Sequence, residues 1–564
     1  MKMKKNLVLL LAILFLTSPA SSQTETDHNL KINKNLEIFN SIYRKLDMMY
    51  VDSIDADKTI NTAINSMLRS LDPYTIYYPE DDEKELKFMI TGKYGGIGSI
   101  VRYSAKRKGV MIEEPYLNTP AAEAGLKKGD LILSINDTSM VGKTVSEVSD
   151  KLRGESGTSF KLVIERPTTK KKMTFNITRR AINQPAVPYY GMIDENIGYI
   201  RLISFTEGCA EKMKNAFLDL KDKGMKSLIF DLRSNGGGSE AEAAEIVNMF
   251  IPKDIVVVSN KGKMKRTNHD YKTNEEPLDT EIPVVLLVDD ETASASEITS
   301  GALQDLDRGV VMGTKTFGKG LVQMTIGLPY DGTMKFTTSK YYIPSGRCIQ
   351  AVDYRNRGAQ KDSTKTANIF HTKNGRVVKD GGGIQPDIEI KPDTIPNIAL
   401  YLSMSAVDST DVMHEYIVDY VYRHKTIAPA REFSLTDEEY EEFKKRVIES
   451  GFTYDPQTKK VVTELEKLAK FEGYYDVAKQ EFENLKEKLT HNIAKDLETN
   501  KKEILNILNN DIVRCYYYQA GGIENLLDHD KFIKEACELL KDKDRYEGIL
   551  KPKAEENKGD AKEE

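Results

Sequence analysis

The spacing of apolar residues changes several times along the chain, and each spacing predicts a different kind of element. Between Asn29 and Glu83 the apolar residues follow at three- and four-residue steps, which indicates helices with one buried face. Ile282 to Val288 and Gly309 to Gly313 are short apolar runs rich in β-branched residues, which are typical of buried strands. After about Asp393 the helical steps return beside a charged face. We therefore predict a multidomain α/β protein, with a core of mixed sheet and helices and with helical regions at both ends.

A strand, a sharp turn and a helix follow one another between Ile282 and Leu306. Asp289 and Asp290 end the strand, and the small residues of TASASE lead into a helix that we expect to run to about Leu306. Folds expose nucleophiles at such turns, because helix amides and the helix dipole stabilise an anion that develops on the substrate. Ser294 stands at this turn and is therefore a candidate nucleophile.

A serine nucleophile needs a base, and the candidate in this region is a lysine. None of the seven histidines lies between Asp289 and Gln323. A lysine serves as a base when burial lowers its pKa from about 10.4 towards about 7–8, so that the neutral amine accepts the serine proton. Lys319, in the segment FGKG, has little side-chain bulk beside it, and Gln323 follows as an acceptor for its amine. The residues alone leave Ser296 and Lys315 as alternatives, since such a serine is commonly a cap and such a lysine is commonly solvated.

The stretch ASASEI…GTKTFGKGLVQ resembles the active-site signature of the carboxy-terminal processing (tail-specific) peptidases, a family of serine–lysine endopeptidases. The resemblance implies that Ser294 is the nucleophile, that Lys319 is the base and that Gln323 orients the base. The family spacing between the serine and the lysine is kept. Further upstream, SLDPYT (Ser70 to Thr75) resembles another element of these peptidases, although its simpler interpretation is a helix stop with a proline turn.

A third segment, DLRSNGGG, resembles the family element that lies beside the nucleophile. It implies an oxyanion hole in which the pair Gly236 and Gly237 supplies one backbone amide and Ala295 supplies the second. Glycine lets a backbone approach a reacting carbonyl closely. Which of the two glycines donates stays open, and the alternative is a strand-to-helix loop without a catalytic role.

The region 91–180 contains the segments GGIGSIV and PAAEAGLKKGD, and on these it resembles a PDZ domain. Gly95, Gly96, Ile97 and Gly98 open the segment GGIGSIV, and we expect them to form a loop whose amides capture a terminal carboxylate. An edge strand able to take up a peptide follows this loop. The segment PAAEAGLKKGD at the expected distance strengthens the resemblance. The alternative is a PDZ fold that serves only as a spacer.

Composition and charge exclude several classes of function. The net charge is −6 over 564 residues, which does not favour a nucleic-acid partner. The four cysteines are scattered without metal-ligand spacing, so we predict neither a metal site nor a disulfide framework, although a Cys515–Cys537 bridge stays open. No cofactor is expected.

The first 22 residues read as an export signal. Lys2, Lys4 and Lys5 precede the apolar run Leu7 to Leu16, which is too short to span a bilayer comfortably, and small residues follow with cleavage expected after Ala20 or Ser22. An uncleaved anchor is the alternative. We therefore expect a protein that is exported to the periplasm or cell envelope and soluble after cleavage.

The predicted domains are a signal peptide (1–22), a helical region (29–90), a PDZ domain (91–180), a peptidase core (181–393), a helical C-terminal domain used for oligomer contacts (394–550) and a disordered charged tail (551–564). The predicted function is exported serine endopeptidase, acting near the free C-termini of protein or peptide substrates through an acyl-enzyme on Ser294. The expected partners are these substrates, further copies of the chain bound through the helical N- and C-terminal regions, and an unidentified regulatory adaptor. A catalytically silent PDZ adaptor and a crotonase-like enzyme of acyl thioesters are the alternatives.

Overall fold

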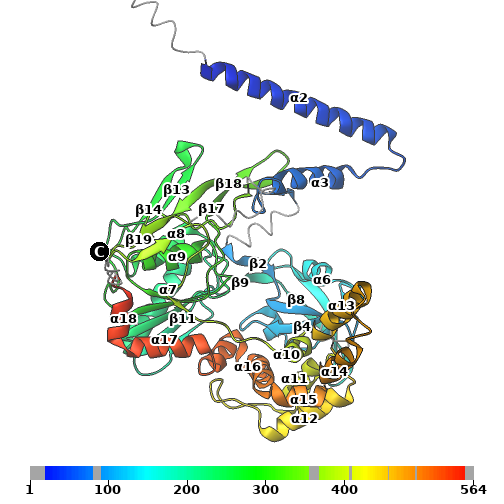
Figure 1. The fold of residues 1–564 in the computed structure, drawn as a ribbon. Helices are drawn as coiled ribbons and strands as arrows, with labels where there is room; N and C mark the ends of the chain where they lie inside the picture. The colour runs from blue at the N-terminus through cyan, green and yellow to red at the C-terminus, as the bar shows by residue number, and fades with distance from the viewer. Residues whose placement is uncertain are drawn as a thin grey trace, which may run out of the picture. The chain divides into compact units, whose positions relative to one another are not determined.

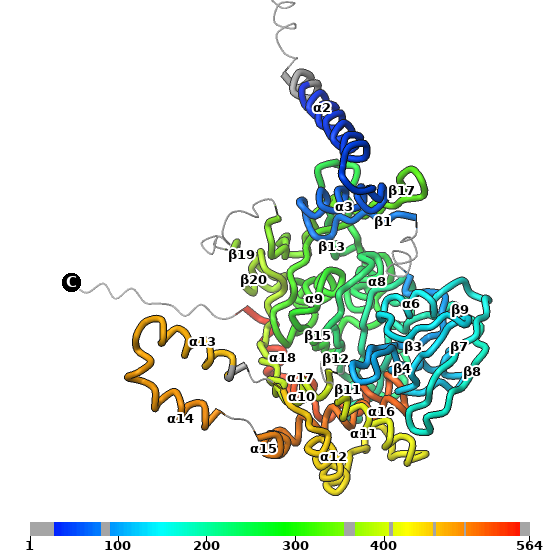
Figure 2. The backbone as a smooth tube through the Cα atoms, turned by 90° about the vertical axis from the view of Figure 1, so that its right-hand side faces the viewer, coloured from blue at the N-terminus to red at the C-terminus, as the bar shows by residue number. Residues whose placement is uncertain are grey.

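The computed structural model describes residues 20–80, 91–354, 367–404, 410–454, 457–489 and 492–552 (Figure 1, Figure 2). The chain divides into two compact units between Tyr77 and Tyr78. The predicted signal sequence lies outside the described residues as far as residue 19, and so does the predicted charged tail from residue 553 onwards. Within the described ranges, no helix combines the length and the apolar character that crossing a bilayer requires.

The first unit consists mainly of two helices. α2 spans Ala20–Met49 and α3 spans Ala56–Arg69, so the prediction of helices in this region is confirmed. Asp55 caps α3, because its side chain accepts the amide of Lys58 at 3.0 Å. The apolar stripe of α2 is largely exposed to solvent, and Phe39 keeps 47% of its surface accessible.

The SLDPYT segment forms a tight turn after α3. The carboxylate of Asp72 accepts the backbone amides of Tyr74 and Thr75, each at 2.8 Å. This is the geometry of an aspartate that fixes its own turn. The chain then enters the short strand β1 (Ile76–Tyr78) at the boundary of the two units.

The PDZ region folds as an antiparallel sheet with two short helices. Its strands are β3 (Ser99–Ser104), β4 (Gly109–Pro115), β5 (Leu131–Ile135), β6 (Thr138–Ser139), β7 (Ser159–Arg166) and β8 (Lys171–Thr178). Its helices are α5 (Pro120–Glu123) and α6 (Val145–Leu152). β3 lies at the edge of the sheet and contacts α6, so the expected edge strand is present. Two further strands, β2 (Lys93–Gly96) and β9 (Arg180–Asn183), pair with each other where the chain enters and leaves this region.

The peptidase core is built on a six-stranded sheet. In spatial order its strands are β10 (Tyr189–Met192), β11 (Ile197–Arg201), β12 (Ser227–Asp231), β15 (Val284–Val288), β16 (Val310–Gly313) and β21 (Ile388–Glu389). Neighbouring strands are parallel, except that β10 is antiparallel to β11. β12 and β15 are buried along their whole length, as expected for a parallel sheet that is covered on both faces.

Side chains of this sheet alternate between two cores. On one face, residues such as Phe230 and Leu286 pack with α7 (Cys209–Asp222), α8 (Glu240–Asn248) and α9 (Ala295–Asp305). On the other face, the neighbouring Ile229 and Leu287 pack with α17 (Lys531–Lys541) and α18 (Lys543–Ile549), which Figure 1 draws in red. The last helices of the chain therefore complete the peptidase core. α17 and α18 belong to the C-terminal helical region predicted over 394–550, and their apolar faces pack on this sheet. The sequence did not predict this contact, because apolar steps identify a helix face without identifying its partner.

A second sheet holds the strand that follows the candidate base. β13 pairs with β14 and β18, and β18 pairs in turn with β17. Their bounds are β13 (Val256–Gly262), β14 (His269–Lys272), β17 (Leu321–Gly327) and β18 (Thr333–Tyr342), with a short 3-10 helix, η2 (Lys265–Thr267), after β13. The polar segment predicted as a surface excursion, 351–379, contains the strands β19 (Ile369–His371) and β20 (Val377–Lys379), which form a hairpin.

Among the remaining C-terminal helices, a bundle with its own apolar core is formed by α10 (Asn397–Ser403), α11 (Val412–Arg423), α12 (Asp437–Glu449), α15 (Ile493–Thr499) and α16 (Lys501–Leu526). α13 (Gln457–Glu472) and α14 (Lys479–Leu489) pack on each other as a separate hairpin. The apolar steps predicted from Phe482 to Leu497 fall on two separate helices, α14 and α15. α16 is kinked at Tyr518, whose φ of 58° and ψ of −163° are not helical.

The bundle and the PDZ region share an interface with buried charges. Asp411 is almost fully buried, and its carboxylate accepts the hydroxyl of Ser104 at 2.9 Å and pairs with Arg102 at 3.3 Å. On α16, Arg514 pairs with the buried Glu114 of β4. Because removing one partner of a buried pair leaves an uncompensated charge, these contacts fix how the two parts dock.

Candidate active site

Ser294 lies at the turn between β15 and α9, as the sequence predicted. Its φ of 56° and ψ of −118° are strained for a residue with a side chain. The residue is 9% exposed, and the next residue, Ala295, begins the helix. The helix runs to Asp305, in agreement with the predicted end near Leu306. The hydroxyl of Ser294 thus stands at a helix N-terminus, where an anion is stabilised.

A buried carboxylate joins the serine turn to the lysine loop. Oε2 of Glu297 accepts the backbone amides of Ser294 and Lys319, each at 2.9 Å. Oε1 accepts the hydroxyl of Thr316 at 2.5 Å and the amide of Gly318 at 2.7 Å. Glu297 has no exposed surface, and burial raises its pKa to about 7 against the four donated hydrogen bonds. One side chain therefore fixes both candidate catalytic residues through their backbones.

The segment FGKG needs both of its glycines for steric reasons. Gly318 has a φ of 86°, and a Cβ at that position would meet the Cβ of Ala351 at 2.6 Å. A Cβ on Gly320 would lie 2.8 Å from the backbone nitrogen of Gln350. The segment with Gln350 and Ala351 therefore packs directly against the residues on both sides of Lys319. Lys319 itself is partly buried.

Lys319 also lies near a second acidic group. Burial raises the pKa of Glu240, while the charge of Lys319 works in the opposite direction. Asn260 donates to Oε2 of Glu240 at 2.7 Å. Because burial favours the neutral form of Glu240, this carboxyl is a weak stabiliser of an ammonium on Lys319.

Gln323 lies on β17, four residues after the lysine. A register irregularity between Val322 and Gln323 interrupts the pairing of β17 with β18. Such bulges re-aim side chains and are common beside active sites. The side-chain nitrogen of Gln323 donates to the carbonyl of Leu321 and to the hydroxyl of Thr337, both at 3.2 Å. These two bonds occupy the side-chain nitrogen, so the carbonyl oxygen is the atom of this amide that can accept a hydrogen bond.

The predicted oxyanion loop packs against the serine turn. Gly237 has a φ of 93°, and a Cβ there would lie 2.8 Å from both the nitrogen of Ala295 and the Cβ of Ser294. The amide of Gly237 donates to Oδ1 of Asn235 at 2.9 Å. Among the described residues, no partner is recorded for the amides of Gly236 and Ala295. This arrangement favours Gly236 over Gly237 as the first donor and retains Ala295 as the second.

Asn235 holds this loop in place. It is fully buried, and its side-chain nitrogen donates to the carbonyl of Leu202 at 2.9 Å. Its own carbonyl accepts the amide of Ala293 at 3.0 Å and the hydroxyl of Ser296 at 2.9 Å. Ser296, the sequence alternative to Ser294, is therefore committed to a structural hydrogen bond.

The structure places the four predicted PDZ loop residues differently from one another. Gly95 and Gly96 belong to β2 and pair with β9, so the expectation that they form a loop is wrong. A Cβ on Gly95 would lie 2.0 Å from the carbonyl oxygen of Gly154, which explains the glycine by close backbone approach. Ile97 is buried in the PDZ core. Gly98 remains in the connection to β3, with a φ of 71°.

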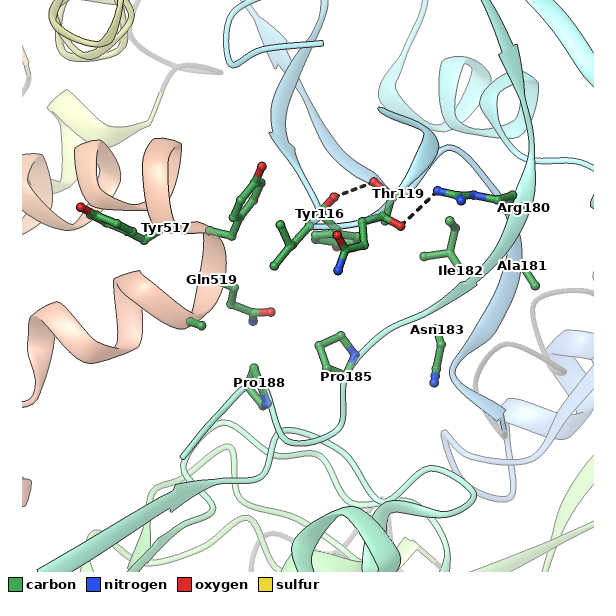
Figure 3. A pocket seen from close by; sticks show the side chains of 14 residues that line it. Tyr116, Thr119, Arg180, Ala181, Ile182, Asn183, Pro185, Pro188, Tyr517 and Gln519 are labelled. Atoms are coloured by element: carbon green, nitrogen blue, oxygen red, sulfur yellow. Dashed lines mark hydrogen bonds between the residues drawn. The ribbon is translucent and has the colours of Figure 1, made fainter. Parts of the chain in front are cut away.

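A cavity of about 500 Å³ lies where the PDZ region meets the kinked helix α16 (Figure 3). Tyr116 and Thr119 line one side, and the hydroxyl of Thr119 donates to the backbone carbonyl of Tyr116 at 2.7 Å. Tyr517 and Gln519 line the side formed by α16. Arg180, on β9, contributes a charged group. The cavity is remote in sequence from the catalytic segments and belongs to the junction between domains.

Sequence reasoning missed Glu297, Asn235 and Thr316. A signal for Glu297 exists, because Ser294-x-x-Glu297 has the spacing of a helix capping box. Within the described ranges no group of three or more metal-binding side chains occurs, and all four cysteines are free, including Cys515 and Cys537.

Comparison with known proteins places these features in a family. Residues 196–364 match the profile of peptidase family S41, residues 111–166 match that of a PDZ domain, and residues 403–540 match "Probable PDZ-protease, C-terminal helical domain". The chain is 35% identical over 331 residues to a carboxy-terminal-processing protease of Bartonella bacilliformis, covering 58% of this chain and 75% of that protein. It is 31% identical over 336 residues to the carboxy-terminal processing protease CtpB of Bacillus subtilis, covering 59% and 68%.

Among solved structures, the photosystem II D1 C-terminal processing protease is 26% identical with a TM-score of 0.35, covering 63% of this chain and 87% of that one. The family matches define the class of this protein: it is a serine-type peptidase that carries a PDZ domain. The chain belongs to the carboxy-terminal-processing proteases of peptidase family S41.

Proposed function

We propose that this protein is an exported endopeptidase that cuts protein or peptide substrates near their C-termini by a serine–lysine acyl-enzyme mechanism. The observation that supports this most strongly is the carboxylate of Glu297, which binds the amides of Ser294 and Lys319 at once. The nucleophile and the base come from segments on either side of β16, and this contact brings their backbones together.

In the proposed reaction the neutral amine of Lys319 takes the proton of the Ser294 hydroxyl while Oγ attacks the scissile carbonyl carbon. The electron pair of the C=O bond moves to oxygen, where the amides of Gly236 and Ala295 stabilise the charge. The ammonium of Lys319 then gives its proton to the leaving nitrogen as the C–N bond breaks. Water, deprotonated by Lys319, attacks the resulting ester, and Ser294 recovers its proton.

Substrate tails are proposed to bind the PDZ domain. β3 offers a free sheet edge with α6 beside it, which is the arrangement that takes up an extended peptide as an added strand. The amides near Gly98 are the proposed partners of the terminal carboxylate. Binding there holds an unfolded tail close to the peptidase site and raises its effective concentration.

Association with further copies of the chain is proposed to use the hairpin of α13 and α14, which Figure 2 shows extending from the bundle. Phe471 is 89% exposed and Val477 is 87% exposed. The segment 457–489 contains seven basic and seven acidic residues, so two hairpins do not repel each other electrostatically. Substituting Phe471→Glu tests this by light scattering. A wild-type chain that stays monomeric would instead favour a regulatory adaptor on this face.

Mass spectrometry of the intact protein after treatment with a fluorophosphonate tests the catalytic proposal. The expected result is one adduct on Ser294 in the wild type and none in Ser294→Ala, together with cleavage products that map near substrate C-termini. A wild-type protein that neither forms the adduct nor cleaves unfolded peptides would favour the silent PDZ adaptor. Export is tested separately by sequencing the N-terminus of the protein recovered from the cell envelope, which we expect to begin after Ala20 or Ser22.

A further inference from the structure

The strand that leads into the oxyanion loop ends in a buried charge network. Asp231, the last residue of β12, has no exposed surface. Its Oδ2 accepts the hydroxyl of Tyr199 at 2.7 Å and pairs with Arg201 at 2.7 Å and with Arg233 at 2.6 Å. The two guanidinium groups hold the pKa of Asp231 well below its usual range, despite its burial. The backbone immediately before the oxyanion loop is therefore fixed on its β12 side.

Arg233 also reaches a helix that is distant in sequence. Its Nη1 donates to Oδ2 of Asp530 at 2.8 Å, and its guanidinium lies 5.0 Å from the ring centre of Phe532. Asp530 is the N-cap of α17, and its other oxygen accepts the amides of Phe532 and Ile533 at 2.8 and 3.2 Å. One carboxylate thus begins the helix and binds the arginine.

The residues after Arg233 form the oxyanion loop itself. Ser234 has a φ of 54°, and its amide donates to both carboxylate oxygens of Asp289 at 2.9 Å. Asn235 and Gly236 follow directly. The loop is consequently held from three sides: by α9 through Asn235, by the end of β15 through Asp289, and by α17 through Arg233.

The ion pair between Arg233 and Asp530, which joins the loop to α17, lies beside a cavity. This cavity, of about 390 Å³, is lined among others by Arg233, Ser234, Asp289, Leu526 and Asp530. If Asp530 no longer accepts its Nη1, Arg233 keeps its pair with Asp231, and the part of its guanidinium that faces α17 has room in this cavity to move. The backbone of Arg233 belongs to the same network, because its carbonyl accepts Nη2 of Arg201 at 2.7 Å and its amide donates to Oδ1 of Asp231 at 3.0 Å. A shift of the guanidinium on Asp231 therefore disturbs the backbone next to the oxyanion loop.

We propose that Asp530 is a positioning residue for catalysis, which acts through Arg233 to hold the oxyanion loop in its active geometry. The C-terminal helix α17 then supports the chemistry of the site as well as covering the core sheet. This inference rests on the proposed catalytic function of Ser294 and its oxyanion hole. Oxyanion-hole donors act through exact placement, so loss of the support lowers the rate of the chemical step rather than substrate binding.

The test compares Asp530→Asn with Asp542→Asn in the full-length protein. Asparagine caps helices about as well as aspartate, so both variants keep their helix starts. Asp542 is the N-cap of α18, where its side chain accepts the amide of Arg545 at 3.0 Å. We expect Asp530→Asn to lower kcat for an unfolded peptide, and the rate of fluorophosphonate attack on Ser294, by roughly tenfold. KM and Tm should match those of Asp542→Asn.

A double-mutant cycle with Arg233→Met supplies a second measurement. If Asp530 acts through Arg233, adding Asp530→Asn to Arg233→Met causes no further loss of kcat. Equal kcat in Asp530→Asn and Asp542→Asn, or a lowered Tm with unchanged kcat, overturns the inference. The comparison of the two asparagine variants decides the matter even where Arg233→Met does not fold. Failure of wild-type Ser294 to react would instead reject the proposed function.

Discussion

The backbone amide of Ser294 donates a 2.9 Å hydrogen bond to Oε2 of Glu297. This contact closes the first turn of α9 and at the same time holds the strained backbone of the serine. Because the same carboxylate binds the loop that carries Lys319, a change at Glu297 disturbs the nucleophile and the base together.

Replacing Glu297 by glutamine is predicted to impair turnover severely without removing a reacting group. Above pH 7, where the Glu297 carboxylate accepts four hydrogen bonds, the amide nitrogen of glutamine would instead face two backbone or hydroxyl donors. Each buried donor without a partner costs about 1–3 kcal/mol, so we expect kcat/KM to fall roughly 10- to 100-fold. Glu291→Gln, on the exposed side of the same turn, is the matched control and should retain activity. Equal activity of the two variants would contradict the role of Glu297.

A comparison of the wild type with Glu297→Gln also reports on the pKa of Glu297. Burial raises that pKa to about 7, so the fold favours the neutral carboxyl. The stabilisation by the neutral carboxyl is therefore complete below the unfolded pKa near 4.3 and is lost as the pH rises through 7. Urea unfolding at pH 5 and pH 8 should therefore show the wild type losing about 3 kcal/mol relative to Glu297→Gln. A difference that is independent of pH would show that Glu297 is ionised throughout.

Substitutions of the two serines in the S-A-S-E segment should have different effects on activity. Ser294→Ala removes the nucleophile and is expected to abolish peptide cleavage while the protein remains folded. Ser296→Ala removes only the 2.9 Å bond from its hydroxyl to the carbonyl of Asn235. Since one neutral hydrogen bond contributes about 1 kcal/mol, we expect a loss of several-fold in kcat. Titration of active sites with a fluorophosphonate distinguishes the variants, and inactivation by Ser296→Ala with activity in Ser294→Ala would reverse the assignment.

Local patterns predicted the elements that place Ser294 and Gln323, since a buried strand, a small-residue turn and a helix are all encoded within a few residues. The approach of Glu297 to Thr316 and Gly318 could not be predicted in this way, because it depends on how two loops meet in three dimensions. The same limit applies to α17, whose apolar stripe predicts burial but not the sheet that buries it. The prediction of a binding loop at Gly95 is wrong, because glycine is common both in binding loops and where strands pass close to another backbone.

The pH dependence of cleavage tests the assignment of the base. If the neutral amine of Lys319 accepts the serine proton, kcat/KM should rise with pH as the lysine loses its proton. Lys319→Arg should be inactive over the whole range, since arginine stays protonated. Gln323→Ala should be weaker than the wild type but active, because it removes orientation rather than the base. A functional Lys319→Arg enzyme would falsify the mechanism.

Acid is predicted to loosen the docking of the PDZ domain on the bundle through His414. This side chain is buried, and neither ring nitrogen has a hydrogen-bond partner among the described residues. Burial, together with Arg102, Arg107 and Lys128 of the PDZ domain, lowers the pKa of His414 well below its usual value. Stabilisation by the neutral ring is therefore present above the unfolded pKa of about 6.5 and is lost as the pH falls towards the lower folded value.

Amide hydrogen exchange at pH 7.5 and pH 5.5 checks this prediction, after correction for the intrinsic effect of pH. The interface segments of β3 and α11 should exchange faster in acid in the wild type, and His414→Phe should suppress the acid effect because its ring cannot be protonated. The carboxylates of Asp411 and Glu415 face the same interface and pair with Arg102 and Lys106. Acid loosening that persists in His414→Phe would assign the effect to those carboxylates.

The last prediction concerns the choice of substrate by the PDZ domain. A terminal carboxylate that is bound by backbone amides near Gly98 contributes charge-assisted hydrogen bonds of about 1.5–3 kcal/mol. Amidating the C-terminus of a cleavable peptide should therefore raise KM roughly 10- to 100-fold, while the hydrolysis of a small ester at Ser294 stays unchanged. Deleting residues 94–180 behind a short linker should remove the preference between the free and the amidated peptide. If both peptides are cut equally by the full-length enzyme, the PDZ domain is a spacer.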